Sequence, residues 1–302
     1  MTTPHPTPAQ TSSRRIAVLG IGMMGLPMAR RLCAAGHAVR VWNRSRPKAE
    51  ALAACGAQVC HSAPEAVADA ELVITLLSDG SAVADVLFSQ GVADAMATGT
   101  MVVDMSSIKP AEAREHARRL AAQGLRHLDA PVSGGTVGAE QGQLAIMAGG
   151  EASDFAEVEA VFQSLGRATH VGPHGAGQLA KLANQMIVGI TIGAVAEALL
   201  LCERGGADPA RVREAIGGGF ADSRILQLHG QRMVDGDFSK RAAMTVQLKD
   251  MRNALETARE TAFEAPVTTL FERLYADAVE HGLGELDHSG LFVELARRNG
   301  MR

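Results

Sequence analysis

Residues 15–25 read RIAVLGIGMMG, and this segment decides the fold of the N-terminal half of the chain. Residues 15–19 are typical of a buried strand, the glycines follow in the order GxGxxG, and residues 26–35 have helical spacing that ends at Gly36. In this order of strand, turn and helix, the glycines permit a tight turn, the approach of a pyrophosphate, and close packing of the helix. We therefore expect a dinucleotide site at Gly20, Ile21, Gly22, Met23, Met24 and Gly25. The alternative is a glycine-rich turn without a ligand.

A second strand, residues 38–42, ends in Asn43, Arg44 and Ser45. Sites that prefer NAD usually carry an acid here, which bonds the ribose 2′-hydroxyl and repels a 2′-phosphate. This chain has no acid at that place and offers a cation and a hydroxyl instead. The sequence therefore favours NADP(H), with NAD(H) possible, and the alternative is that Arg44 is simply a solvated arginine.

Strand and helix patterns then alternate as far as residue 172. Such repeated units form a doubly wound parallel sheet, which binds ligands at the carboxyl ends of its strands. Leu77-Ser78 and Ser106-Ser107 stand at the ends of two of these strands, so we expect them to contact the cofactor. The predicted strands are 72–77, 101–105, 144–148 and 169–172, and the predicted helices are 110–123 and 154–165.

Residues 175–204 predict one long helix with its polar side chains at the front end. Lys181 lies beside Asn184 and Gln185 there, because residues three and four apart on a helix share a face. The rest is apolar all round, which indicates a helix buried on most sides. We expect Lys181 to be the catalytic group between two domains, and the alternative is a snorkelling lysine at a helix start.

Past Gly175 the pattern is helical throughout. Further helices are predicted at 209–216, 223–234, 243–262, 266–280 and 287–298. The predicted fold class is α/β: an N-terminal Rossmann-type doubly wound sheet followed by an all-α C-terminal domain, linked by the long helix. The predicted divisions are a disordered tail (1–13), a dinucleotide-binding domain (14–174), and a helical substrate and oligomerisation domain (175–302).

Two further motifs contain groups of the kind that bind ligands. Ser133, Gly134 and Gly135 combine a hydroxyl with two glycines, whose exposed backbone N–H groups can hold a carboxylate or phosphate. An ordinary glycine-rich loop is the alternative. His170 and His174 are four residues apart, but the intervening glycine and proline exclude a shared helix face, so we expect no metal site.

Composition narrows the classes of protein. The chain has 302 residues, a net charge of −4 and no long basic run, so nucleic acid is not an expected partner. Its four cysteines form no CxxC and suggest reduced thiols in the cytoplasm. Residues 1–13 lack the features of a signal peptide, and the apolar run at 186–201 is short for a membrane span and contains Glu197, so no membrane is expected.

From about residue 14 to its end, the chain resembles the β-hydroxyacid dehydrogenases, the family of 3-hydroxyisobutyrate dehydrogenase, tartronate semialdehyde reductase and glyoxylate reductase. The N-terminal fingerprint GxGxMGxxMAxNL is present in residues 20–32, with Arg31 in place of Asn. DAPVSGG is intact at 129–135. GxxGxGxxxKxxN is present in residues 172–184, and the KLANQ form is most like the tartronate semialdehyde reductases. The family's usual Leu-Pro is Leu77-Ser78 here.

The resemblance implies a role for each matching residue. Lys181 would be catalytic, residues 133–135 would hold the substrate carboxylate, and Asn184 would help to position it. Ser107 falls at a small hydroxyl position near the nicotinamide, and Lys249 matches the lysine that reaches the cofactor.

The implied enzyme is an NAD(P)-dependent 3-hydroxyacid dehydrogenase or reductase acting on a short semialdehyde or hydroxy acid, as a homodimer or homotetramer. Lys181 would protonate the alkoxide during reduction, and oxidation would need its pKa to lie below about 10.4. The alternatives are an imine reductase, whose N-terminal half looks similar, and a catalytically silent relative that binds the cofactor. A decarboxylating 6-phosphogluconate dehydrogenase shares the domain plan but has a longer helical half.

Overall fold

The structure is a computed structural model that describes residues 13–301. The described residues form two compact units that separate within one helix, after Leu179. The predicted disordered tail lies outside the described residues except for Ser13, whose hydroxyl donates to the carbonyl oxygen of Gly36 at 2.9 Å. The predicted domain limits, 14–174 and 175–302, stay predictions.

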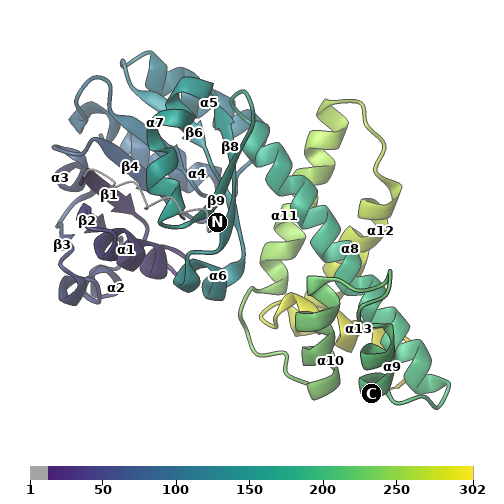
Figure 1. The fold of residues 1–302 in the computed structure, drawn as a ribbon. Helices are drawn as coiled ribbons and strands as arrows, with labels where there is room; N and C mark the ends of the chain where they lie inside the picture. Colours follow the sequence, from purple (N-terminus) through teal and green to yellow (C-terminus); the bar gives the residue numbers. More distant parts are fainter. Residues whose placement is uncertain (1–12, 302) are drawn as a thin grey trace, which may run out of the picture. The chain divides into compact units, whose positions relative to one another are not determined.

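The first unit is built on a sheet whose described strands follow the order β3-β2-β1-β4-β5-β6-β8-β7, with β9 paired to β8 (Figure 1). The chain leaves β1 toward β3 and then crosses to β4 on the other side. This reversal between β1 and β4 is where open α/β sheets bind ligands. The strands are β1 (Arg15–Leu19), β2 (Ala38–Trp42), β3 (Gln58–Val59), β4 (Leu72–Thr75), β5 (Met101–Asp104), β6 (Arg126–Asp129), β7 (Val132–Ser133), β8 (Leu144–Gly150) and β9 (Gly166–Gly172).

One edge of the sheet departs from the prediction. Strands β1 to β6 pair in parallel, but β8 runs antiparallel to both β6 and β7. The expectation of a wholly parallel sheet is therefore wrong at this edge. Hydrophobic periodicity reports which faces of a strand are buried, but it carries no information on the direction of the neighbouring strand.

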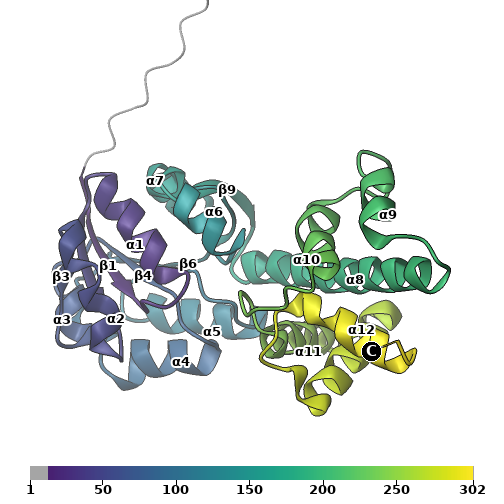
Figure 2. The ribbon, with the colours of Figure 1, turned by 90° about the horizontal axis from the view of Figure 1, so that it is seen from below.

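Helices cover both faces of the sheet because successive strand residues point to opposite sides. Ile16 and Val18 join an apolar cluster with α1, α6 and α7, whereas Ala17 and Leu19 join one with α3, α4 and α5 (Figure 2). The fold class predicted for this half is confirmed. The helices and short helical turns are α1 (Gly25–Ala34), α2 (Arg46–Glu50), η1 (Ala53–Cys55), α3 (Ala63–Val67), α4 (Gly80–Ala84), η2 (Asp85–Ser89), η3 (Ala93–Ala95), α5 (Pro110–Ala121), α6 (Gly135–Gln141) and α7 (Ala152–Gln163).

The second unit is helical, as predicted. Its core contains the wholly buried Tyr275, together with Ile192 and Leu199 of the long helix. Gly193 lets that helix approach its neighbour, because a Cβ there would lie 2.0 Å from the ring of Phe271. The elements are α8 (Ala176–Arg204), which begins in the first unit, α9 (Pro209–Ile216), η4 (Leu226–Gly230), α10 (Gln231–Asp235), α11 (Met244–Glu260), α12 (Pro266–Ala278), η5 (Val279–Leu283), η6 (His288–Gly290) and α13 (Leu291–Arg298).

Helix α8 is less buried than its composition predicted. Ile187 is 66% exposed and Leu201 is 72% exposed, so burial on most sides is wrong for a single chain. Among the described residues, α8 is the one helix long and apolar enough to cross a membrane by length and composition alone. An apolar pattern on all sides of a helix indicates that its whole surface is to be buried. A second molecule can bury that surface as well as the same chain can.

Candidate functional site

In the glycine turn after β1, the first and third glycines are tightly packed, and the second faces open space. Gly20 has φ +106°, and a Cβ there would lie 2.3 Å from the carbonyl oxygen of Leu76. A Cβ on Gly25 would lie 2.0 Å from the carbonyl oxygen of Gly20, whereas a Cβ on Gly22 would meet nothing within 4 Å. Helix α1 then starts without a side-chain cap and without an acidic residue in its first turn. Open space before an uncapped helix start fits a pyrophosphate.

Residues 43–45 divide their roles. The Asn43 side chain holds the glycine turn: its Oδ1 accepts from the backbone N–H of Ile21 at 2.9 Å, and its Nδ2 donates to the carbonyl of Ser45 at 2.9 Å. Arg44 and Ser45 are exposed beside it. No hydrogen bond or ion pair engages the Arg44 guanidinium within residues 13–301, which leaves it available for a phosphate.

The loops after β4 and β5 are joined by hydrogen bonds. The backbone N–H of Leu77 donates to Ser106 Oγ at 2.9 Å. Ser78, which stands where the family has proline, donates its hydroxyl to Asp79 at 2.8 Å, and Asp79 in turn caps α4. These contacts tie the loop after β4 to the start of α4. Ser107 lies half-buried at the end of β5.

Ser133, Gly134 and Gly135 form the junction between β7 and α6. Gly134 has φ +141° and Gly135 has φ +64°, which are conformations that glycine adopts without strain. Both glycines are exposed, and α6 starts without a side-chain cap. Their backbone is therefore accessible from solvent, and the binding of an anionic group there stays a prediction.

A buried cluster of hydrogen bonds fixes the start of α8 within the first unit. The carboxylate of Asp129 accepts from the backbone N–H groups of Gly175, at 2.7 Å, and of Gln178, at 2.9 Å. The Gln178 side chain accepts from the backbone N–H of Ile108 and donates to the carbonyl of Ser106. Helix and strand approach so closely that a Cβ on Gly177 would lie 2.3 Å from the carbonyl oxygen of Asp129.

In the second unit, Lys181 is buried and donates to Gln185. Its Nζ lies 2.9 Å from Gln185 Oε1, which also accepts from Asn184 Nδ2 at 2.9 Å. The amide nitrogen of Gln185 donates to Asp250 Oδ2 at 2.8 Å. Gln185 therefore joins the lysine to a buried carboxylate one side chain away, and the sequence-predicted pair of Lys181 and Asn184 does meet here.

Two members of this network, both on α11, were not predicted. Gln247 donates to the carbonyl of Gln185 at 2.9 Å, and Asp250 forms an ion pair with Lys249 at 3.3 Å. The helical spacing of Lys181 and Gln185 predicted that these two side chains lie side by side, and the hydrogen bond between them agrees. The contribution of α11 depends on tertiary packing, which spacing along one helix does not reveal.

Burial dominates the electrostatics of Lys181. Removal from water lowers the pKa of its ammonium group to about 8, the nearby carboxylate of Asp250 raises it, and Lys249 lowers it further. A lysine with such a pKa can give up and regain a proton near neutral pH. The second unit therefore holds a buried lysine with a lowered pKa, and the first unit holds the two glycine-rich turns at residues 20–25 and 133–135.

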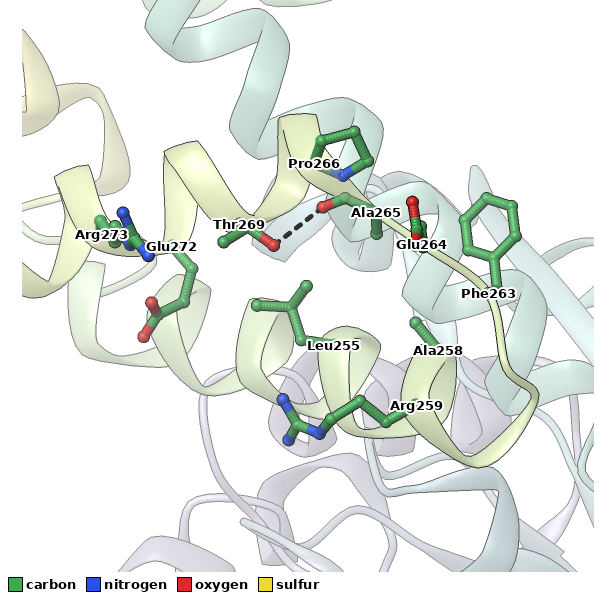
Figure 3. A pocket seen from close by; sticks show the side chains of 10 residues that line it. All are labelled: Leu255, Ala258, Arg259, Phe263, Glu264, Ala265, Pro266, Thr269, Glu272 and Arg273. Carbon is green, nitrogen blue, oxygen red and sulfur yellow. Dashed lines mark hydrogen bonds between the residues drawn. The ribbon is translucent and has the colours of Figure 1, made fainter.

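A cavity of about 530 Å³ elsewhere in the second unit lies apart from this chemistry (Figure 3). It is an open hollow between the end of α11 and the start of α12, and Leu255, Phe263 and Thr269 line it. None of the predicted site residues belongs to it. It is a surface hollow rather than the candidate site.

Both halves of the chain match known families of NAD(P)-binding domains. Residues 15–173 match the NAD-binding domain of 6-phosphogluconate dehydrogenase, and residues 175–295 match the NAD-binding domain of NADP-dependent 3-hydroxyisobutyrate dehydrogenase. The chain is 40% identical to 2-hydroxy-3-oxopropionate reductase of Escherichia coli K12, over 93% of this chain and 97% of that protein.

Solved structures of hydroxyacid dehydrogenases and of reductive aminases resemble this chain to different degrees. The 3-hydroxyisobutyrate dehydrogenase of Mycobacterium tuberculosis, solved with L-serine, superposes with a TM-score of 0.86 at 32% identity, over 94% of this chain and 99% of that one. A reductive aminase of Aspergillus terreus, solved with NADPH and ethyl levulinate, reaches a TM-score of 0.59 at 25% identity, over 94% and 100%. The likeness is therefore greater to the hydroxyacid enzyme.

Replacing the buried lysine should stabilise the fold. A lysine whose pKa falls from 10.5 to about 8 on folding costs on the order of 3 kcal/mol at pH 7. Between these two values the unfolded chain still binds the proton that the folded chain has lost, so wild-type stability should rise with pH. We expect Lys181→Met to be more stable at pH 7, by up to about 3 kcal/mol, with the difference shrinking from pH 8 to 10.5.

Urea unfolding of both proteins across pH 7 to 10.5 measures this difference. The exposed Lys240, changed to Met, is the control and should leave the wild-type pH dependence unaltered. Parallel stability curves for wild type and Lys181→Met would show that the lysine titrates normally.

Proposed function

The chain belongs to the β-hydroxyacid dehydrogenase family, and from this premise we propose that its substrate is a short acid most like 2-hydroxy-3-oxopropionate or 3-hydroxyisobutyrate. It is an NAD(P)-dependent hydroxyacid dehydrogenase. The observation that carries the proposal is the buried Lys181, which Gln185 holds through a hydrogen bond of 2.9 Å. Glyoxylate, succinic semialdehyde and 3-phenylserine-like acids belong to the same substrate class.

We propose the following roles for the residues of this chain. The backbone at 133–135 binds the substrate carboxylate, with Asn184 helping to position it. The nicotinamide, when bound, supplies or accepts the hydride. In reduction, the Lys181 ammonium stabilises the alkoxide that forms on the substrate oxygen and donates a proton to it. In oxidation, neutral Lys181 accepts the proton of the substrate hydroxyl.

Gln185 and Asp250 set the state of this lysine. The Gln185 amide oxygen fixes the Nζ, and its amide nitrogen is held by Asp250, so the side chain cannot turn its oxygen away without losing that bond. Because burial lowers the pKa of Lys181 to about 8, the ammonium form dominates at pH 7. Reduction should then decline above about pH 8, and oxidation should increase over the same range.

The test is turnover on a panel of these acids, with Lys181→Met and the exposed Lys240→Met compared. A positioned general acid contributes on the order of 10² to 10⁴ in rate, so Lys181→Met should lose that much kcat, and Lys240→Met should lose none. The imine reductase alternative is tested in the same assay with ketone and amine pairs. A loss below tenfold, or better turnover of amine and ketone than of any acid, would overturn the proposal.

NADP(H) is the proposed cofactor. Arg44 is exposed at the end of β2 with no partner within residues 13–301, and the nearest acid in sequence after it is Glu50. A guanidinium binds a phosphate through two parallel hydrogen bonds, which a ribose hydroxyl cannot offer. The proposed preference therefore rests on this side chain, with Ser45 beside it.

Arg44→Ala should raise the KM for NADP at least tenfold and leave the KM for NAD nearly unchanged, since a charge-assisted hydrogen bond contributes about 1.5–3 kcal/mol. Arg46→Ala is the matched control, because Arg46 is also exposed but already contacts Glu50 and His61. Steady-state kinetics with both dinucleotides measure the two ratios. Equal effects of Arg44→Ala on both would contradict the assignment.

We also propose that the protein is a homo-oligomer in the cytoplasm, with no membrane or nucleic acid partner. The exposed side chains of Ile187 and Leu201 on α8, with Phe263 and Leu270 in the same unit, form apolar surface that a second copy could cover. The four cysteines are free thiols, which suits a reducing compartment.

Light scattering of detergent-free protein should give at least twice the chain mass of 31.6 kDa. Leu201→Asp should lower that mass by placing a charge on the apolar face of α8, whereas the exposed Glu280→Lys should not. A wild-type mass equal to one chain, or protein recovered only with detergent, would contradict the oligomer.

A further inference from the structure

Three potential metal ligands meet in the first unit, outside the residues assigned to the reaction. His127 and Asp129 are two residues apart on β6, so their side chains share one face of the strand. His174 follows β9 in the turn before α8. One ligand atom from each of the three residues lies within 4.8 Å of the other two.

His127 is an unusual buried histidine. Its exposed fraction is 2%, and neither Nδ1 nor Nε2 has a hydrogen-bond partner within residues 13–301. The Nδ1 of His174 is also buried without a partner there. A buried polar group left unpaired costs about 1–3 kcal/mol.

The two rings do not satisfy each other. Their centroids lie 5.7 Å apart and their planes are tilted by 43°, and no hydrogen bond joins them. Both rings therefore direct lone-pair nitrogens into the same small space. A group that accepts an electron pair from each ring would provide a partner for one nitrogen of each.

Asp129 adds a negative charge to this space. Its two oxygens each accept one backbone N–H, from Gly175 and Gln178, and each keeps further acceptor capacity. No lysine or arginine forms an ion pair with it in the described part of the chain. A buried carboxylate is normally paired with a cation or bound to a metal.

We propose that His127, Asp129 and His174 bind a divalent transition-metal ion, with Zn²⁺ as the type case. Two imidazoles and one carboxylate are a common Zn²⁺ ligand set, whereas Mg²⁺ and Ca²⁺ prefer oxygen ligands alone. Ligands about 2.0–2.1 Å from a tetrahedral ion lie about 3.4 Å from one another. The group needs to contract by little more than 1 Å, which a rotation of the half-buried His174 can supply.

The ion would have a structural role. It would join the end of β6 to the turn that leads into α8, where Asp129 already holds two backbone N–H groups. None of its three ligands is a residue to which we assign contact with the substrate or cofactor. The inference therefore stands independently of the proposed function.

The experiment uses the full chain without a polyhistidine tag, stripped with a chelator and then titrated with Zn²⁺ against a chromophoric competitor. Co²⁺ in place of Zn²⁺ gives a visible absorption band whose intensity reports tetrahedral coordination. The variants are His127→Phe, which fills the buried space without a ligand atom, and His174→Gln. His170→Gln is the matched control: His170 is a nearby half-buried histidine whose Nε2 contacts the carbonyl of Gly150 at 2.8 Å.

We expect one equivalent of Zn²⁺ on wild type and on His170→Gln, with at least a tenfold loss of affinity in His127→Phe and in His174→Gln. Zn²⁺ should raise the Tm of the first two proteins only, because a ligand that binds the folded state stabilises it. If His127→Phe does not fold, His174→Gln decides alone. No binding above background, binding equal in all four proteins, or a Co²⁺ spectrum without the tetrahedral band would overturn the proposal.

Discussion

The buried carboxylate of Asp129 is the contact on which much of the first unit depends. Asp129 is the last residue of β6, and its carboxylate accepts hydrogen bonds from the backbone N–H groups of Gly175 and Gln178 at the start of α8. One side chain therefore joins the end of a strand to the start of a helix. Gln178 adds the loop after β5 to the same cluster. Gly177 makes this possible, because any larger residue would push the helix away from the strand. The glycine at position 177 of the GxxGxGxxxKxxN motif therefore has a packing reason of its own.

Burying Lys181 lowers its pKa but also costs folding free energy. A buried ammonium is costly, and the fold reduces this cost with an amide rather than a direct ion pair. A carboxylate in direct contact would hold the pKa high and keep the lysine charged. Burial lowers the pKa of Lys181 to about 8, and Asp250, which Gln185 keeps one side chain away, raises it against that effect. A neutral amide between the two charges thus holds the lysine in place without adding a charge.

Local sequence rules predicted the elements of this fold better than their tertiary contacts. The strand, turn and helix at residues 15–34 follow from glycine and periodicity, and so does the start of the helical half. The antiparallel direction of β8, the exposed face of α8 and the network around Gln185 depend on residues far apart in sequence. His174 illustrates the difference: its spacing from His170 predicted no shared face and no metal site, yet folding brings it close to His127 and Asp129 of β6. Spacing identifies partners within one element and is silent on partners that folding brings together.

The contacts of Gln178 also determine where this chain can be recombined with a relative. A chimera joined at residue 174 would keep the two donors to Asp129, because any residue other than proline supplies a backbone N–H. It would exchange the Gln178 side chain for whatever the relative carries, and with it the bonds to Ile108 and Ser106. A junction after Leu179 falls where the two compact units separate and transfers this cluster whole. Modular exchange of cofactor-binding halves should therefore carry the first turn of the long helix along with the sheet.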